Sequence, residues 1–108
     1  MAKLEKALTG DFDTLLRKIE KGVLDGSVSA TLEASADYQG AGSRCSVRVF
    51  ERYSWTGNNR VSMSLTMYQT GSTIRLCAVT SGGSQATFFK INTMGEEAFL
   101  ETLERILD

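Results

Sequence analysis

Apolar and polar side chains alternate with a period of two residues through the middle of this sequence of 108 residues. Glycine-containing segments separate the alternating stretches, which cover residues 27–38, 44–55, 60–70 and 73–80. Because successive side chains of a β-strand point to opposite faces of a sheet, this pattern is typical of half-buried strands. A last strand is expected over residues 85–91. The sequence therefore predicts a meander of about five antiparallel strands.

Two amphipathic segments flank these strands and predict helices. Residues 11–24 carry one apolar stripe, and Asp11 is suited to cap the helix because its carboxylate can accept first-turn amides. The second helix follows Thr93, which with Glu96 fits a capping box. Residues 2–9 fit either a short edge strand, which we favour, or an extension of the first helix.

Each helix must bury its apolar stripe, and the simplest arrangement places both helices on one face of the sheet. We therefore predict a two-layer α+β sandwich that forms a single domain over residues 1–108. The small alanines of residues 27–38 indicate that a helix packs close to that strand. The face toward the helices is expected to carry the apolar rows, namely Ala34, Ala36, Val47, Val49, Met63, Leu65, Met67, Ile74 and Leu76.

Basic residues are concentrated in the middle of the chain, although the net charge is −1. Residues 44–92 hold six basic side chains and one acidic side chain. We expect the basic side chains to lie on the sheet face away from the helices and to bind a small anionic ligand. A turn with consecutive glycine amides, which can form an anion-binding nest, would lie at its edge. The predicted site consists of Arg44, Arg48, Arg52, Arg75, Lys90, Gly82, Gly83 and Ser84.

Two other interpretations of this face stay open. The arginines can decorate a solvated sheet face and pair locally with Glu51 or with the acidic helix ends. Alternatively, a second copy of the chain covers the face, because arginine and aromatic residues are enriched at interfaces. Phe50, Tyr68 and Val79 would then contribute to a homodimer.

The absence of histidine excludes several chemistries. Ser-His-Asp and Cys-His nucleophiles and histidine-ligated zinc are impossible within the chain. We expect no catalytic residue, no metal and no cofactor. Cys45 and Cys77 are expected on opposite faces of the sheet, which forbids a disulfide between them. Cys77 is a weak candidate nucleophile, because Arg75 beside it could favour the thiolate.

Composition also narrows the cellular setting. No apolar run approaches the roughly 20 residues of a membrane helix, and the N-terminus lacks the apolar core of a signal peptide. We therefore expect a cytoplasmic protein with no membrane association. Nucleic acid is not an expected partner, because the isoelectric point is near 5.5 and the acidic helices would repel phosphates.

Six short segments, spread over nearly the whole chain, are specific when taken together: Gly10-Asp11-Phe12-Asp13, Gly26-Ser27-Val28-Ser29, Val49-Phe50-Glu51-Arg52-Tyr53, Gly82-Gly83-Ser84-Gln85, Phe88-Phe89-Lys90-Ile91-Asn92-Thr93 and Gly95-Glu96-Glu97. In these segments the chain resembles a small bacterial family of about this length, a domain of unknown function. The resemblance implies a free-standing bacterial cytoplasmic protein with no assigned activity, so it carries over no functional residues.

The order of strands and helices also resembles that of helix-grip domains that bind ligands, although this likeness is architectural only. An alternative function is therefore a carrier of a small apolar ligand, held in a cavity between the sheet and the helices. The expected lining of that cavity is Val47, Val49, Met63, Leu65, Met67 and Trp55.

Overall fold

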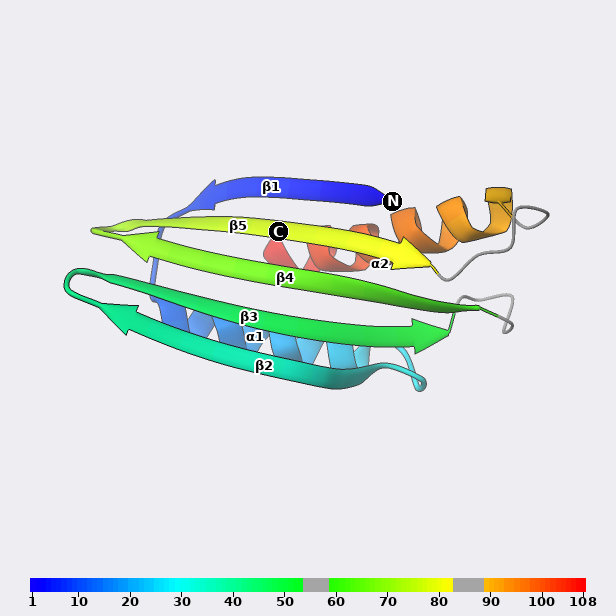
Figure 1. Ribbon diagram of the computed structural model, residues 1–108, viewed down its shortest axis with the longest axis horizontal. Coiled ribbons are helices and arrows are strands. Elements are labelled where there is room, and N and C mark those ends of the chain that lie inside the picture. Colours follow the sequence, from blue (N-terminus) through cyan, green and yellow to red (C-terminus); the bar gives the residue numbers. More distant parts are fainter. Residues whose placement is uncertain (54–58, 83–88) are drawn as a thin grey trace.

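The computed structural model describes residues 1–53, 59–82 and 89–108. In chain order the elements are β1 (Ala2–Leu8), α1 (Phe12–Asp25), β2 (Thr31–Gly40), β3 (Ser43–Tyr53), β4 (Arg60–Thr70), β5 (Thr73–Gly82) and α2 (Phe89–Leu107). The strands form one five-stranded antiparallel sheet in the order β1-β5-β4-β3-β2 (Figure 1). The predicted α+β fold with five antiparallel strands and two helices is therefore confirmed.

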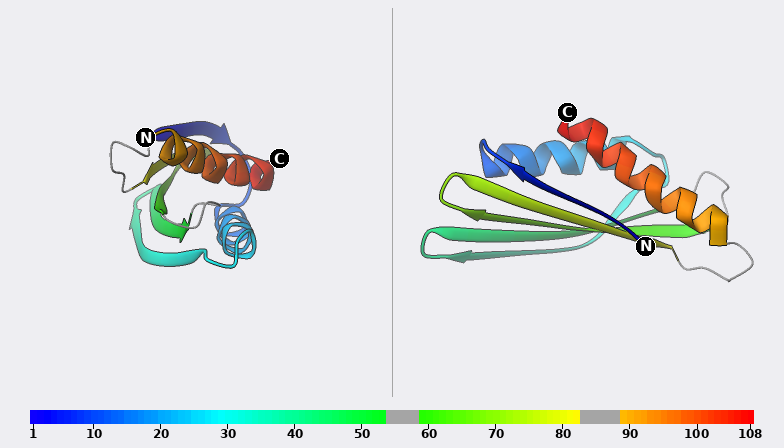
Figure 2. Two further views of the ribbon diagram at one scale, coloured as in Figure 1. Left: turned by 90° about the vertical axis from the view of Figure 1, so that its right-hand side faces the viewer. Right: turned by 90° about the horizontal axis from the view of Figure 1, so that it is seen from above.

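Both helices lie on the same side of the sheet, as predicted (Figure 2). The sheet curls partly around them, and α2 packs against β5, β4, β1 and α1. The opposite side of the sheet, which we call the outer face, is not covered by any element of the described residues (Figure 1). None of the described helices is long and apolar enough to cross a membrane.

The start of α1 follows the predicted capping pattern. The backbone N–H of Thr14 donates to Asp11 Oδ2 at 2.8 Å, which satisfies an amide that has no partner within the helix. Leu15 of the predicted apolar stripe is only partly buried, whereas the other four residues are buried in the core: Phe12, Leu16, Ile19 and Val23.

The two helices meet closely because α1 has glycine where they touch. A Cβ atom on Gly22 would lie 2.6 Å from Cδ1 of Ile106 on α2. One turn later, a Cβ atom on Gly26 would lie 3.3 Å from Cγ2 of Thr102. The missing side chains at Gly22 and at Gly26, the residue that caps the end of α1, therefore make room for α2.

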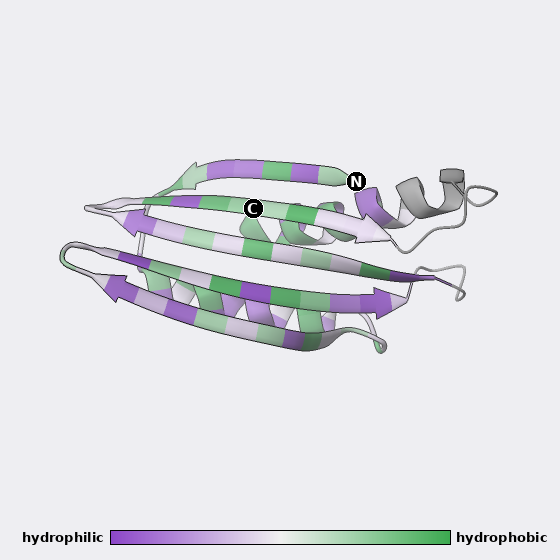
Figure 3. Cartoon of the chain, in the orientation of Figure 1, coloured by the Kyte–Doolittle hydropathy of each residue, from purple (hydrophilic) through white to green (hydrophobic). Residues whose placement is uncertain are grey.

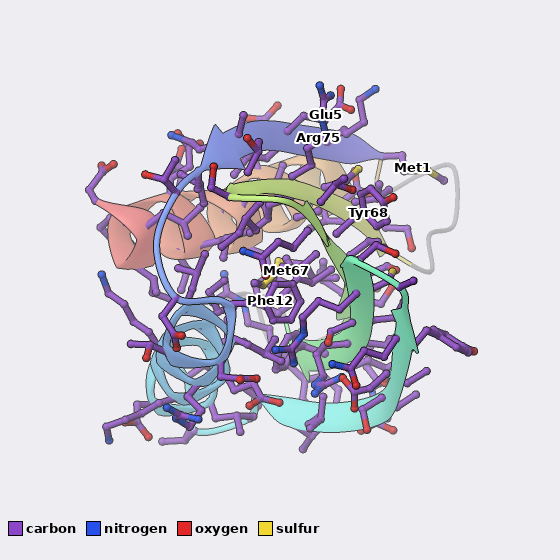
Figure 4. The ribbon with its side chains drawn as sticks, turned by 90° about the vertical axis from the view of Figure 1, so that its left-hand side faces the viewer. Met1, Glu5, Phe12, Met67, Tyr68 and Arg75 are labelled. Carbon is purple, nitrogen blue, oxygen red and sulfur yellow. The ribbon has the colours of Figure 1, made fainter. Side chains whose placement is uncertain are left out.

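The core lies between the helices and the central strands. The inward rows of β4 and β5 match the alternation in the sequence, and Figure 3 shows hydrophobic and hydrophilic residues alternating along the strands. Figure 4 shows Phe12 of α1 and Met67 of β4 pointing into this layer. The buried rows are Val61, Met63, Leu65 and Met67 on β4, and Ile74, Leu76 and Ala78 on β5.

Two tight turns that the sequence indicates are also present. A two-residue turn joins β2 to β3, and its second residue, Gly42, has a φ of +75°. Another two-residue turn joins β4 to β5, and its first residue, Gly71, has a φ of +62°. Glycine suits both positions because other residues rarely adopt a positive φ.

The prediction of which way β3 faces is wrong. Phe50 pairs with Met63 and Arg48 pairs with Leu65, and residues directly opposite one another share a face of the sheet. The polar row of β3 therefore points toward the helices and the apolar row points away. The inward row is Arg44, Ser46, Arg48, Phe50 and Arg52, and the outward row includes Cys45, Val47 and Val49.

The prediction for β2 is wrong for a different reason, an irregularity in the strand. The pairing with β3 shifts between Leu32 and Ala34, so Glu33 is an extra residue. A bulge of one residue turns all later side chains to the other face of the sheet. The expected helix over the alanines is therefore absent from the described structure. The residues that point away from the helices are Ala34, Ala36 and Tyr38.

The ends of the chain also differ from the prediction. Helix α2 begins at Phe89, so the strand expected over residues 85–91 is wrong for 89–91, and 85–88 lie outside the described residues. The capping box is wrong because Thr93 and Glu96 both lie within the helix. The fifth strand is instead β1, which confirms the favoured interpretation of residues 2–9.

Candidate functional site

The outer face carries a patch of small uncharged side chains over four adjacent strands. The register places Ala34, Val49, Ser64 and Val79 in one row across the sheet. The next row is Ala36, Val47, Thr66 and Cys77. We call these eight residues the outer patch. None of them has a charge, whereas the solvated face of an antiparallel sheet is normally polar.

Charged side chains on this face lie around the outer patch and balance in sign. Lys3 and Glu5 on β1 pair at 3.3 Å. At one end of the sheet Arg60 pairs with Glu51 and Glu33. Together with Arg75, these residues form what we call the rim of the outer patch. The rim has three basic residues, Lys3, Arg60 and Arg75, and three acidic residues, Glu5, Glu33 and Glu51. The charges of these six side chains therefore cancel.

A shallow depression of about 450 Å³ lies at the edge of the outer patch, over β1, β5 and β4. Its lining includes Glu5, Thr66, Tyr68, Arg75 and Cys77. Figure 4 shows Glu5, Tyr68 and Arg75 on the opposite side of the sheet from Met67. Tyr68 and Arg75 are both exposed and directly opposite one another on β4 and β5. Arg75 is thus the predicted site arginine that does lie on the outer face.

Arg44 and Arg48 lie on the other side of the sheet and attach α1 to β3. Arg44 donates two hydrogen bonds to the carboxylate of Asp13, at 2.8 and 3.2 Å, and its guanidinium stacks 4.1 Å from the Phe12 ring centre. Arg48 is only 8% exposed, and its Nε lies 2.8 Å from Glu20 Oε2. These two arginines therefore already have carboxylate partners within the chain.

A second carboxylate, that of Asp37 on β2, completes the network around Arg48. Arg48 Nη1 lies 3.0 Å from Asp37 Oδ1, and the Ser46 hydroxyl donates to the same oxygen at 2.6 Å. The hydrogen bond from Ser46 and then that from Arg48 lower the pKa of Asp37. Similarly, the hydrogen bond from Arg44 lowers the pKa of Asp13. Both carboxylates are stabilised in their charged form.

Arg52 has a different environment. Its guanidinium lies 4.3 Å from the centre of the Phe99 ring, and its Nη1 donates to the Thr102 hydroxyl at 3.3 Å. Arg105 Nη2 donates to the same hydroxyl at 3.4 Å. Burial lowers the pKa of Arg52, and the charge of Arg105 lowers it further. Two guanidinium groups are therefore held together at the junction of β3 and α2.

The predicted arginine stripe is thus divided by the fold. Arg44, Arg48 and Arg52 face the helices and Arg75 faces away, so the structure does not bring the four together. Lys90 lies in α2, and its side chain is outside the described residues, as are Gly83 and Ser84. The expectation of one continuous basic sheet face is therefore wrong.

Gly82 is used to join elements rather than to form an open anion nest. Its N–H donates to Oε2 of Glu96 at 2.8 Å, and Glu96 is only 5% exposed. The other carboxylate oxygen of Glu96 lies 2.7 Å from the amino group of Met1. This buried carboxylate therefore fixes the ends of β1 and β5 to α2.

The two cysteines both lie on the outer face, so the expectation of opposite faces is wrong. Cys45 pairs with Tyr68 on β4, and Cys77 pairs with Thr66 on the other edge of that strand. Both thiols are free. Two strand spacings of about 4.8 Å separate β3 from β5, which exceeds the reach of a disulfide. Within the described ranges, no three potential metal ligands come together.

The residues expected to line a carrier cavity are divided between the two faces. Met63, Leu65 and Met67 are fully buried in the core, whereas Val47 and Val49 belong to the outer patch. Trp55, the remaining residue of that set, lies outside the described residues.

Sequence reasoning missed the partners of the inward arginines. Asp13 and Glu20 are seven residues apart on α1, so both lie beside its buried stripe, and this spacing is the signal that could have found them. Thr102 and Arg105 are likewise three residues apart on one side of α2.

Comparison with known families agrees with the resemblance noted in the sequence. The sequence model of DUF6054, described as a family of unknown function, matches residues 1–108. A search of the curated proteins found no match. The chain belongs to the DUF6054 family, which confirms the prediction of a small domain of unknown function.

Proposed function

We propose that this protein is a non-enzymatic cytoplasmic interaction domain that forms a homodimer through the outer patch. The observation that carries the proposal is the inverted polarity of β3. This strand places three arginines toward the helices and leaves Cys45, Val47 and Val49 on the face that no described element covers.

Such an inversion requires a reason, because burying a charged group is costly unless it has partners. Here Arg48 is compensated by Glu20 and Asp37, and Arg44 by Asp13. A sheet that only needed to be solvated would place arginines outside and valines inside. The opposite arrangement is expected when the outer face is itself buried in an assembly.

A second copy of the same chain is the partner that best fits this face. A two-fold interface brings the same surface from each copy together, so a face with net charge would repel itself. The rim has three charges of each sign and avoids this repulsion. Small side chains on four adjacent strands also let two sheets approach to about 10 Å.

The size of the sheet is adequate for a dimer. The four spacings of about 4.8 Å between five strands, and about ten residues at roughly 3.3 Å along each strand, give a face of about 600 Å². Two copies would bury about 1,200 Å², which is at the lower end of the areas that specific interfaces bury.

The two cysteines support the proposed location in the cytoplasm. They lie on strands that β4 separates, and unpaired thiols are consistent with a reducing compartment.

Light scattering after gel filtration tests the proposal. The chain has a mass of 11.8 kDa, and the native protein should have about twice that mass at micromolar concentration. Val47→Lys should give a monomer, because it would place an unpaired ammonium group in the middle of the interface. Thr66→Lys, at the paired position of β4, should have the same effect.

Leu24→Lys is the matched control, since Leu24 is an apolar residue exposed on α1 and should leave the dimer intact. Labelling of Cys77, within the outer patch, should also be slower in the native protein than in Val47→Lys. A native monomer, or a dimer that survives both lysine substitutions in the sheet, would contradict the proposal.

A further inference from the structure

The cluster of Arg52, Thr102 and Arg105 is separate from the outer patch. Arg52 lies on the inner face of β3, and the other two residues lie on α2. One hydroxyl accepts a hydrogen bond from each guanidinium, at 3.3 and 3.4 Å. The donating nitrogens of the two arginines are therefore within about 7 Å of each other. Two like charges at this distance repel unless an anion compensates them.

No carboxylate among the described residues supplies that compensation. Among the residues that the structure describes, neither arginine forms an ion pair, although Arg44, Arg48 and Arg60 all do. Residues 54–58 and 83–94 contain no Asp or Glu, so these segments cannot provide a side-chain carboxylate either. An anion from outside the chain would therefore meet two guanidinium groups that no described carboxylate already occupies.

The chemistry of the cluster indicates what kind of anion fits. A guanidinium has five N–H donors in a planar fork, and only one bond from each arginine to Thr102 is described. The Thr102 hydroxyl already donates to the Ala98 carbonyl, so it acts here as an acceptor that aligns the two forks. Two forks side by side can each bond a different pair of oxygens on a phosphate group, whereas a carboxylate has only two oxygens for both forks to share.

We propose that Arg52 and Arg105 bind the phosphate group of a small ligand, with Thr102 holding their guanidinium groups in place. The stacking of Arg52 on Phe99 leaves the edge of its guanidinium available for hydrogen bonds. This inference does not depend on the homodimer, because the two sites lie on opposite faces of the sheet.

Titration calorimetry with inorganic phosphate, AMP and acetate at equal ionic strength tests the proposal. Phosphate and AMP should bind saturably, and acetate should not. Binding by inorganic phosphate alone would identify the free ion as the ligand, whereas tighter binding of AMP would identify a phosphate monoester. Arg105→Gln should weaken phosphate binding at least tenfold, and Arg52→Gln should do the same.

Arg17→Gln is the matched control, because Arg17 is an exposed arginine on α1 without an ion pair among the described residues, and its removal should change the affinity less than twofold. Arg105 is exposed, so Arg105→Gln should fold even if Arg52→Gln does not. Val47→Lys should retain phosphate binding, which separates this proposal from the homodimer. Absence of saturable phosphate binding, equal binding of acetate, or unchanged affinity in Arg105→Gln would overturn the assignment.

Discussion

Arg48 joins three elements of the fold through one side chain. It lies on β3, pairs with Glu20 of α1 and with Asp37 of β2, and also donates to the backbone carbonyls of Ala36 and Val47. A buried guanidinium is tolerated only when its donors are satisfied, and Arg48 meets this requirement. The position of α1 over this half of the sheet therefore depends on specific ion pairs as well as on apolar packing.

Arg48→Met tests the importance of these ion pairs. Methionine keeps an apolar stem but leaves two carboxylates without their partner. Glu20 and Asp37 are partly solvated, with side chains 27% and 60% exposed, so we expect a loss of about 1–3 kcal/mol rather than the largest values for buried pairs. Urea unfolding measures the change. The exposed Arg17→Met should change stability by less than about 0.5 kcal/mol, and an equally small effect of Arg48→Met would contradict this account.

At the scale of elements, the contact between α1 and α2 depends on the absence of a side chain. Gly22 lies within the last turn of α1, and glycine inside a helix costs roughly 0.5–1 kcal/mol relative to alanine. The space that a methyl group would need is filled by Ile106 of α2. Close packing of the two helices therefore outweighs the local helix propensity at this position.

Gly22→Ala should lower the free energy of unfolding by about 1–3 kcal/mol, because overpacking exceeds the gain in helix propensity. Removing the opposing side chain should relieve the clash. We therefore expect Ile106→Ala to cost less in the Gly22→Ala background than in the native protein, as a double-mutant cycle measured by urea unfolding would show. Lys18→Ala, on the exposed side of α1, is the control. A stabilised Gly22→Ala protein would show that the helices can move apart easily.

The elements differed in how well the sequence predicted them. The predictions for α1, β4 and β5 were correct because the apolar residues of these elements are also the buried ones, as in the row of Met63, Leu65 and Met67. β3 was wrong because its inward arginines are compensated by carboxylates far away in the sequence. In β2, one extra residue at Glu33 reversed the faces, and no local signal marks it.

The candidate site was predictable only in part, for the same reason. A sequence shows that Arg44, Arg48 and Arg52 share one face of a strand, but only tertiary contacts show which face and which partners. Arg44 and Arg48 meet acidic residues of α1, whereas Arg52 meets Thr102 and Arg105. The difference between these arginines could not be seen without the helix positions.

For the molecule as a whole, the ionic contacts are unevenly distributed. Asp11, Asp13 and Asp37 all have a pKa below the ordinary value of 3.8, chiefly because of hydrogen bonds from Thr14, Arg44 and Ser46 respectively. Asp11 and Asp13 lie at the start of α1, and Asp37 lies on β2, in the half of the sheet that α1 covers. Acid is therefore expected to weaken this half of the molecule first.

The sign of the pH dependence follows from these lowered values. The folded protein binds fewer protons than the unfolded chain around pH 4, so the stabilisation is complete only above about pH 5 and is lost as the pH falls through the folded-state pKa values. Asp13→Asn/Asp37→Asn should be less stable than the native protein at pH 7 and should lose less stability between pH 5 and pH 2. Urea unfolding at several pH values measures this.

Glu97→Gln is the control for that experiment, because Glu97 is exposed and forms no ion pair among the described residues. It should follow the native pH profile. If the double variant lost as much stability in acid as the native protein, the two aspartates would not account for the acid sensitivity.

The pairing of β1 with β5 has a consequence for synthesis. Ala2 lies opposite Thr80, so β1 leaves the ribosome well before β5, the strand with which it pairs. The hairpins from β2 to β5 connect neighbours in the chain and can form in the order of their translation, whereas contacts between distant segments form slowly. During that interval β1 has unpaired backbone groups that other chains or chaperones can bind. Docking of the amino-terminal strand is therefore expected to be the late step that completes the sheet of each newly made molecule.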